Sequence, residues 1–261
     1  MLGAIIGDIV GSRFEFNNTK DFNFKLFTDE CSFTDDTICT VAIADALLRF
    51  QDRGLLGIKQ SLLYWCKQHP LPMGGYGGSF AKWLHSLDHK PYNSFGNGSA
   101  MRVSPIGWYY LSEEAVIAAA TESAVVTHNH PEGVKGAVAT AVAIFYARHY
   151  SKEIMLTKIT DYYPAYTWIE PQIGCNKFNE TCQGTMPVVF GIIRKANSFE
   201  EAIRWAVAVG GDSDTIAAIV GSIAEAIWGI PEPIKKEAMT FLPVRMKAVV
   251  NKFYKMIENE S

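Results

Sequence analysis

The chain has 261 residues, of which 48% are hydrophobic and 20% are charged, and this composition is typical of a soluble globular protein with a large core. The net charge of -3 gives no basic field for nucleic acid or anionic membranes, and no apolar run is long enough for a transmembrane helix. Five scattered cysteines without a CxxC pair, and an N-terminus without a basic segment, favour reduced thiols in the cytoplasm.

Helical periodicity recurs along the sequence and predicts an all-α protein. The predicted helices, in chain order, cover residues 37–50, 55–67, 79–87, 112–126, 131–149, 184–196, 198–209, 215–228 and 233–257. Pro131 suits the first turn of its helix, and Ser198 with Glu201 forms a capping box. Segment 22–27 is the only fair candidate for a strand. No linker divides the sequence, so we predict one domain over residues 1–261.

Two acidic clusters, at residues 32–37 and 210–215, each open an apolar helix. Each combines two carboxylates with hydroxyl groups and contains no His or Cys, which is an oxygen ligand set suited to Mg²⁺ or Mn²⁺. Asp212 and Asp214 do not share a helix face, but the preceding glycine pair 210–211 could supply a turn that brings them together. Capping of a helix N-terminus is the alternative for either cluster alone. Two similar clusters favour a binuclear metal site.

Three segments between the predicted helices are rich in glycine, namely residues 72–80, 96–102 and 210–211. Backbone amides of glycines can approach an anion closely, and Arg102 adds positive charge to the second segment, so this segment could bind a diphosphate. A tight turn is the alternative, because the spacing matches neither a Walker A motif nor a dinucleotide fingerprint. The candidates to stack on a base, or else to pack in the core, are Tyr76, Phe80 and Phe95.

Five segments, taken together and in order, resemble the motifs of the ADP-ribosylglycohydrolase family, which includes the dinitrogenase reductase-activating glycohydrolases. They read GAIIGDIVGSRFE at 3–15, TDDT at 34–37, GNGSAMR at 96–102, THNHP at 127–131 and GDSDT at 211–215. The resemblance extends from Gly3 to Pro231, which is nearly the whole sequence. Ser213 stands where the family commonly has threonine.

The resemblance implies an all-α, orthogonal helical domain with two divalent cations, Mg²⁺ or Mn²⁺, at the base of a cleft. It assigns metal binding to Thr34, Asp35, Asp36, Asp212, Asp214 and Thr215. It assigns substrate binding to Gly96, Asn97, Gly98, Ser99, Met101, His128, Gly211 and Ser213. It gives catalytic roles to Glu15, Asp35 and Asp214, with Glu15 acting as general base or shifting with substrate. Asp8 could support the site or cap a helix.

The implied reaction frees ADP-ribose from an ADP-ribosylated protein side chain or small molecule, with the cations orienting a water toward the anomeric carbon. A two-metal nucleotide phosphohydrolase is an alternative, although such enzymes usually use His–Asp ligand pairs. A catalytically weak ADP-ribose-binding protein is a second alternative. The completeness of both clusters argues against a purely structural role and leaves such a binder open. Acceptor specificity is expected to depend on residues 17–30, 70–95 and 165–182. The sequence identifies neither the acceptor nor the oligomeric state.

Overall fold

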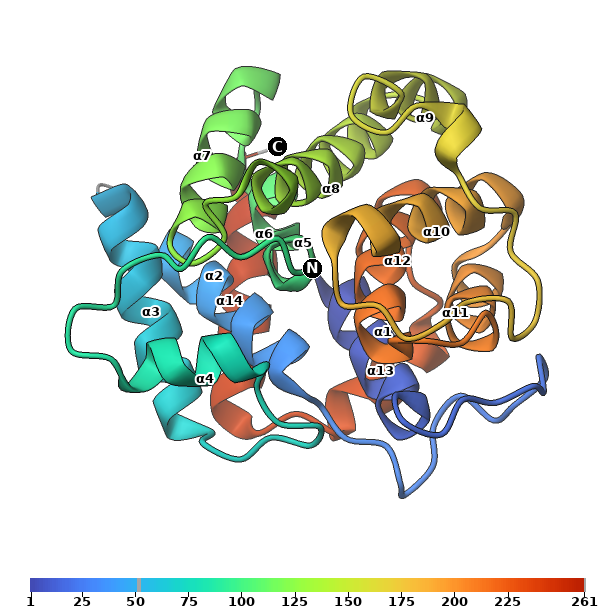
Figure 1. Cartoon of the computed structure of the whole chain (residues 1–261), viewed down its shortest axis with the longest axis horizontal. Helices are drawn as coiled ribbons and strands as arrows, with labels where there is room; N and C mark the ends of the chain where they lie inside the picture. Colours follow the sequence, from blue (N-terminus) through green and yellow to red (C-terminus); the bar gives the residue numbers. More distant parts are fainter. Residues whose placement is uncertain (51–52, 261) are drawn as a thin grey trace.

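The computed structural model describes residues 1–50 and 53–260, and it confirms the all-α prediction (Figure 1). The helices are α1 (Leu2–Gly11), α2 (Asp35–Arg49), α3 (Gly54–Gln68), α4 (Gly78–His85), α5 (Gly98–Arg102), α6 (Ser104–Tyr109), α7 (Glu113–Val125), α8 (Pro131–His149), α9 (Lys152–Ile159), α10 (Cys182–Lys195), α11 (Phe199–Ala208), α12 (Ser213–Trp228), α13 (Glu232–Thr240) and α14 (Val244–Glu260). Short 3₁₀ turns include η1 (Ser12–Phe14) and η3 (Ala165–Thr167). No helix within the described ranges is long and apolar enough to cross a membrane.

Two sequence predictions of local structure are wrong. Segment 22–27 is irregular and not a strand. Its carbonyls are bound by arginine side chains instead of a neighbouring strand, since Arg204 donates to the carbonyls of Phe22 and Phe24 and Arg13 donates to that of Lys25. The helix predicted over 233–257 is two helices, α13 and α14. They are separated at Pro243, which lacks an N–H and disfavours a helical conformation in the residue before it.

Helix α1 packs against α12 at very short distance, because three glycines spaced by four residues form one face of α1. A Cβ atom added at Gly3 would lie 2.1 Å from the carbonyl oxygen of Gly221, and one at Gly7 would lie 1.9 Å from that of Ala217. A Cβ atom added at Gly11 would lie 2.5 Å from the Cα of Asp214. Only glycine permits this contact, which fixes α1 relative to the N-terminus of α12.

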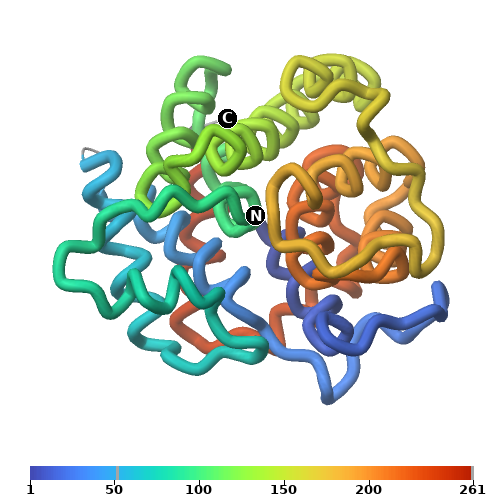
Figure 2. The backbone as a smooth tube through the Cα atoms, viewed as in Figure 1, coloured from blue at the N-terminus to red at the C-terminus, as the bar shows by residue number. Residues whose placement is uncertain are grey.

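The helices surround a region where loops from distant parts of the sequence meet. In the view of Figure 1, α3 and α4 lie on the left, α10 to α12 lie on the right, and α7 and α8 lie across the top. Between the two sides, residues 95–97 run beside residues 180–182 (Figure 2), with an isolated bridge between Gly96 and Thr181. The amide of Asn97 donates to the carbonyl of Glu180 over 2.7 Å. This pairing places the 96–102 segment beside the loop that precedes α10.

Candidate active site

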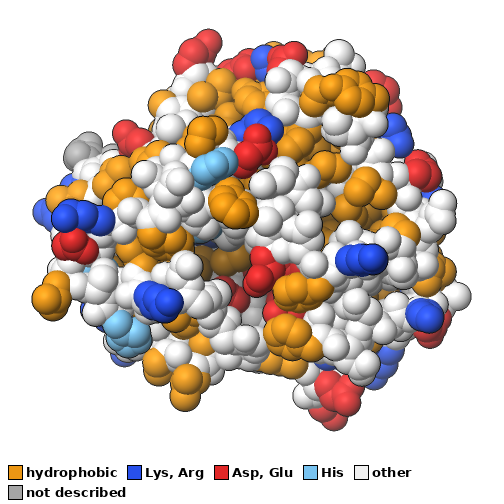
Figure 3. Space-filling model, in the orientation of Figure 1, with side chains coloured by type: hydrophobic (Ala, Val, Ile, Leu, Met, Phe, Trp, Pro, Cys, Tyr) orange, Lys and Arg blue, Asp and Glu red, His pale blue; other side chains and the backbone are white. Residues whose placement is uncertain are grey.

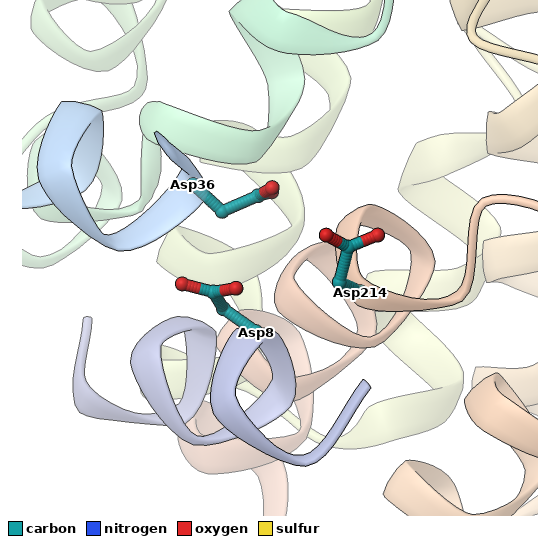
Figure 4. Close-up of side chains that lie close together, drawn as sticks. All are labelled: Asp8, Asp36 and Asp214. Carbon is teal, nitrogen blue, oxygen red and sulfur yellow. The ribbon is translucent and has the colours of Figure 1, made fainter. Parts of the chain in front are cut away.

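Carboxylates from three helices converge at one place. Asp8 of α1, Asp36 of α2 and Asp214 of α12 point toward one another (Figure 4), with one oxygen of each within 4.8 Å of the others. A second group contains Glu15, Asp212 and again Asp214. One oxygen of each of these three carboxylates also lies within 4.8 Å of the others. The two acidic clusters, which are far apart in the sequence, therefore meet in space.

The first cluster is held by capping of α2. Thr34 is the N-cap residue, and its Oγ1 accepts a hydrogen bond from the amide of Asp36 over 3.2 Å. Asp8 also accepts from the amides of Thr34 and Thr37, over 2.9 and 3.0 Å, and from the hydroxyl of Thr34 over 2.7 Å. Capping by Thr34 and Asp8 leaves one oxygen of Asp36 unbound, so capping and a metal site are compatible at this helix end.

The second cluster follows a turn formed by two glycines. Gly210 and Gly211 both have φ of +83°, a left-handed conformation that favours glycine. The side chain of Asn18 bonds both backbone polar groups of Gly211, accepting from its N–H over 2.8 Å and donating to its carbonyl over 2.9 Å. Asn97 then donates to Asp212 over 2.7 Å, which orients that carboxylate. The turn therefore brings Asp212 and Asp214 to the same site, as the glycine pair predicts.

Burial raises the pKa of every carboxyl group in the cluster. Desolvation raises the pKa of Asp8 from 3.8 to about 6. Desolvation, followed by repulsion from Asp212, raises the pKa of Glu15 from 4.5 to about 7. The pKa values of Asp35, Asp36 and Asp214 are raised well above 3.8, first by burial and then by neighbouring carboxylates. Neighbouring like charges in a buried site are unfavourable without a compensating cation.

The donor set fits a hard divalent cation. Asp36 Oδ1 and Asp214 Oδ1 are buried and have no hydrogen-bond partner in the described structure. Among the ion pairs formed by the described residues, none includes a carboxylate of the cluster. The hydroxyl of Thr215 donates to Asp36 Oδ2 over 3.2 Å and joins the two clusters. The potential ligand atoms of these described groups are all carboxylate oxygens, which Mg²⁺ and Mn²⁺ prefer as ligands.

The cluster opens into a cavity of about 540 Å³, within the usual range for small-molecule sites. Figure 3 shows acidic side chains beside the hollow at the centre of this face, with hydrophobic side chains next to them. The polar lining includes Glu15, Asp35, Asp36, Glu180, Asp212, Asp214 and Thr215. The remaining wall includes Phe16, Tyr76, Phe80, Tyr92, Gly96, Asn97, Gly98, Met101, Arg102, His128 and Phe178. Segments 70–95 and 165–182 thus contribute to the wall, whereas 17–30 contributes no lining residue.

The predicted site residues divide into those that line the cavity and those that lie behind it. Asp35 lines it but belongs to neither group of close carboxylates. Thr34 is fully buried behind the cluster, and Ser99 is fully buried with its hydroxyl donating to the carbonyl of Gly133. Gly211 is bound by Asn18, and the hydroxyl of Ser213 is buried without a partner in the described structure. These last four residues do not line the cavity. Of the three base-stacking candidates, Tyr76 and Phe80 line it and Phe95 does not.

Several site residues have no clear signal in the sequence. Asp8 does have a signal in the sequence, because it is the only charged residue in an apolar segment with glycine at every fourth position. Asn18 hydrogen-bonds the turn at Gly211, which is 193 positions away in the sequence. Phe16 and Phe178 stack at a centroid distance of 6.0 Å, and both line the cavity although their sequence neighbourhoods show no motif.

An all-α fold with clustered carboxylates lining a ligand-sized cavity defines a candidate hydrolase. The family model described as ADP-ribosylglycohydrolase matches residues 1–258, so the chain belongs to the ADP-ribosylglycohydrolase family. Members of this family are hydrolases that act on ADP-ribosylated substrates.

Individual relatives extend over most of the chain. It is 23% identical to ADP-ribosylhydrolase ARH3 of Homo sapiens, over 89% of this chain and 85% of that protein. It is 22% identical to the ADP-ribosyl-[dinitrogen reductase] glycohydrolase of Rhodospirillum rubrum, over 88% of this chain and 85% of that protein. A solved structure described as an ADP-ribosylglycohydrolase-related protein complex has a TM-score of 0.76 and 23% identity, covering 98% of this chain and 95% of that chain. The last similarity supports the fold.

Proposed function

We propose that this protein uses two divalent cations, Mg²⁺ or Mn²⁺, to hydrolyse the glycosidic bond between ADP-ribose and an acceptor. The acceptor is a protein side chain or a small molecule, and ADP-ribose is released. The observation that carries the proposal is the group of carboxylates from α1, α2 and α12, whose buried and unpartnered oxygens lie beside a cavity of about 540 Å³. The family membership of the chain supplies the ADP-ribosyl substrate.

The cations would be held by Asp36, Asp212 and Asp214, with Asp8 beside them. The remaining ligands implied by the sequence are Thr34, Asp35 and Thr215. Bound there, divalent cations supply positive charge that lowers the pKa of a water and positions it for attack. The hydrogen bonds from Asn97 to Asp212 and from Thr215 to Asp36 restrict the rotation of these carboxylates.

Glu15 is the candidate general base. It is half-buried, lines the cavity, and has an oxygen close to Asp212 and Asp214. In the metal-free site, burial and the charge of Asp212 raise its pKa to about 7. Cations held by the neighbouring carboxylates would lower that pKa and favour the carboxylate form, which can accept a proton at neutral pH. In the proposed step, Glu15 accepts a proton from the attacking water. The bond between the anomeric carbon and the acceptor breaks as the bond to the water oxygen forms. The acceptor leaves with the electron pair of the broken bond and takes up one proton, which balances the proton that Glu15 accepts.

The 96–102 segment is the candidate diphosphate site. Gly96 and Gly98 line the cavity and expose backbone in place of side chains. A Cβ atom added at Gly98 would lie 3.4 Å from the ring of His128, so a larger residue would crowd this wall. The names of the two relatives above specify ADP-ribosyl chemistry, and that of the Rhodospirillum rubrum protein includes dinitrogen reductase. For this chain the acceptor is left open to experiment.

A panel of ADP-ribosylated acceptors tests the proposal. Substrates modified on arginine, on serine, on a nucleic-acid base and on a small molecule are incubated with protein and Mg²⁺ or Mn²⁺, and the released ADP-ribose is measured. Release from at least one substrate, abolished by a chelator and restored by metal, is the expected result. Cleavage of free ADP-ribose to AMP would instead indicate a phosphohydrolase. Binding of ADP-ribose without release from any substrate would contradict the proposed hydrolysis.

A further inference from the structure

Arg102 is a buried cation without a carboxylate partner in the described structure. It is 1% exposed and still lines the cavity. Its Nη2 donates to the carbonyl of Ser123 over 2.7 Å and to the hydroxyl of Thr127 over 2.9 Å. Both acceptors are neutral, so the positive charge stays uncompensated within this wall. Such a charge attracts an anion to the cavity more strongly than it would in water.

The hydroxyl of Thr127 connects Arg102 to His128. Its oxygen lies 2.7 Å from Nδ1 of His128. A guanidinium group can only donate, whereas a hydroxyl has one proton to donate and two lone pairs. The hydroxyl that accepts from Arg102 therefore still has its own proton available for Nδ1. The phenol of Tyr92 stays protonated at neutral pH, because burial raises its pKa to about 12, and it can donate to the remaining lone pair of the Thr127 hydroxyl, which leaves the threonine proton for Nδ1.

The direction of this hydrogen bond determines which ring nitrogen of His128 carries the proton. The ring is neutral, because burial and the nearby charge of Arg102 lower the pKa of His128 well below 6.5. A neutral imidazole has one N–H, and when Nδ1 accepts a hydrogen bond the N–H is at Nε2. Nε2 has no hydrogen-bond partner in the described structure. It faces the glycine segment, because Cβ atoms added at Gly96 and Gly98 would lie 3.5 and 3.4 Å from it.

We infer that Arg102 and Thr127 are positioning residues that hold His128 with its proton on Nε2, so that His128 donates a hydrogen bond to an anionic oxygen in the cavity. The ligand class is a phosphate ester, which accepts from N–H donors and is attracted by Arg102. In identifying that phosphate with the diphosphate of ADP-ribose, the inference rests on the proposed function. Because the donor is a neutral imidazole, it keeps its proton throughout the neutral pH range.

The tautomer is measured directly on the ligand-free protein. Long-range ¹H–¹⁵N NMR spectra of His128 at neutral pH distinguish a protonated ring nitrogen from a bare one. We expect Nε2 to be protonated and Nδ1 to be bare in the wild type and in Thr127→Ser, which keeps the hydroxyl. Thr127→Val removes the hydroxyl at nearly constant volume, and its spectrum should show a mixture of tautomers. Protonation at Nδ1 in the wild type, or an unchanged tautomer in Thr127→Val, would overturn the inference.

Calorimetric titration with ADP-ribose tests the consequence for binding. Thr127→Val should lower affinity about tenfold, the scale of one hydrogen bond to a charged oxygen, and Thr127→Ser should retain it. In a His128→Ala background, Thr127→Val should cause no further loss. An equal loss in both backgrounds would show a merely structural role for Thr127 and refute the relay. If the wild type binds no ADP-ribose, the proposed function fails, and the ligand-free NMR measurement still decides the tautomer.

Discussion

Replacing Asp8 by asparagine tests whether the clustered carboxylates destabilise the metal-free fold. Asp8 is fully buried and accepts three hydrogen bonds at the N-terminus of α2. The carbonyl of an asparagine can accept the two bonds from the amides of Thr34 and Thr37. Its NH₂ group can donate to the Thr34 hydroxyl, which is 3.3 Å from Asp36 and can donate there instead. Asp8→Asn therefore keeps the shape of the site and removes one negative charge.

The magnitude follows from the raised pKa of Asp8. Its pKa is raised from 3.8 to about 6 by burial, and one pKa unit corresponds to about 1.36 kcal/mol, so ionisation of Asp8 costs the folded state about 3 kcal/mol. The pKa is higher in the folded state than in the unfolded chain. The unfolded chain therefore loses this proton first, and the free energy of unfolding falls as the pH rises from about 4 through about 6. Below that window the cost is absent.

Urea unfolding in the presence of a chelator, at several pH values from about 4 to about 8, measures the effect. The wild type should lose about 3 kcal/mol more than Asp8→Asn across the window. The variant should keep a residual slope, because burial and neighbouring charges also raise the pKa values of Asp36 and Asp214. Added Mn²⁺ should stabilise the wild type more than the variant, since it binds only the folded site. Equal pH slopes for the two proteins would refute this electrostatic account.

Three further tests concern the substrate wall, the chemistry and the helix contact. Gly98→Val should weaken ADP-ribose binding in calorimetry by crowding His128 while metal content stays near wild type, and unchanged affinity would make the segment a simple turn. Asp214→Ala should lose both metal and turnover. Glu15→Gln should keep metal and lose turnover by a factor on the order of 10², and wild-type release of ADP-ribose would deny Glu15 a catalytic role. Gly7→Ala should lower the free energy of unfolding by about 1–3 kcal/mol, because the added Cβ would collide with the backbone of α12. An unchanged Tm in thermal unfolding would contradict that contact.

The longer helices after α1 are predictable from apolar periodicity and capping residues, whereas α1 and several short helices are not. Helix α8 begins at Pro131 and ends at His149, as predicted, and Ser198 caps α11. Helix α1 has no polar face, since all ten of its residues are buried, and so its sequence lacks the alternation on which periodicity depends. The short helices α5, α6 and α9 are likewise missed, because five to eight residues give few turns in which to show a period, although α4, also of eight residues, is predicted over 79–87.

The site shows the same division between local and tertiary information. Segments 34–37 and 210–215 combine carboxylates with the helix cap or glycine turn that positions them, so their proximity to a helix end can be predicted from neighbours in sequence. The side chains that hold these segments in place cannot be predicted in this way. Asn18 bonds Gly211, and Asn97 bonds Asp212, through contacts between residues more than 100 positions apart. The binding of Mg²⁺ or Mn²⁺, and the acceptor that the enzyme takes, stay predictions for experiment.

The separation of the two acidic clusters depends on α1, the helix that the sequence does not reveal. Gly7 allows this helix to contact the backbone of α12 at Ala217, and Asp8 follows directly, about 100° further around the helix. That rotation turns the carboxylate away from the contact and toward the N-terminus of α2, where it bonds Thr34 and Thr37. One helix therefore both packs against the element that holds Asp214 and caps the element that holds Asp36. A substitution that shifts α1 should change the distance between those carboxylates even though it touches neither.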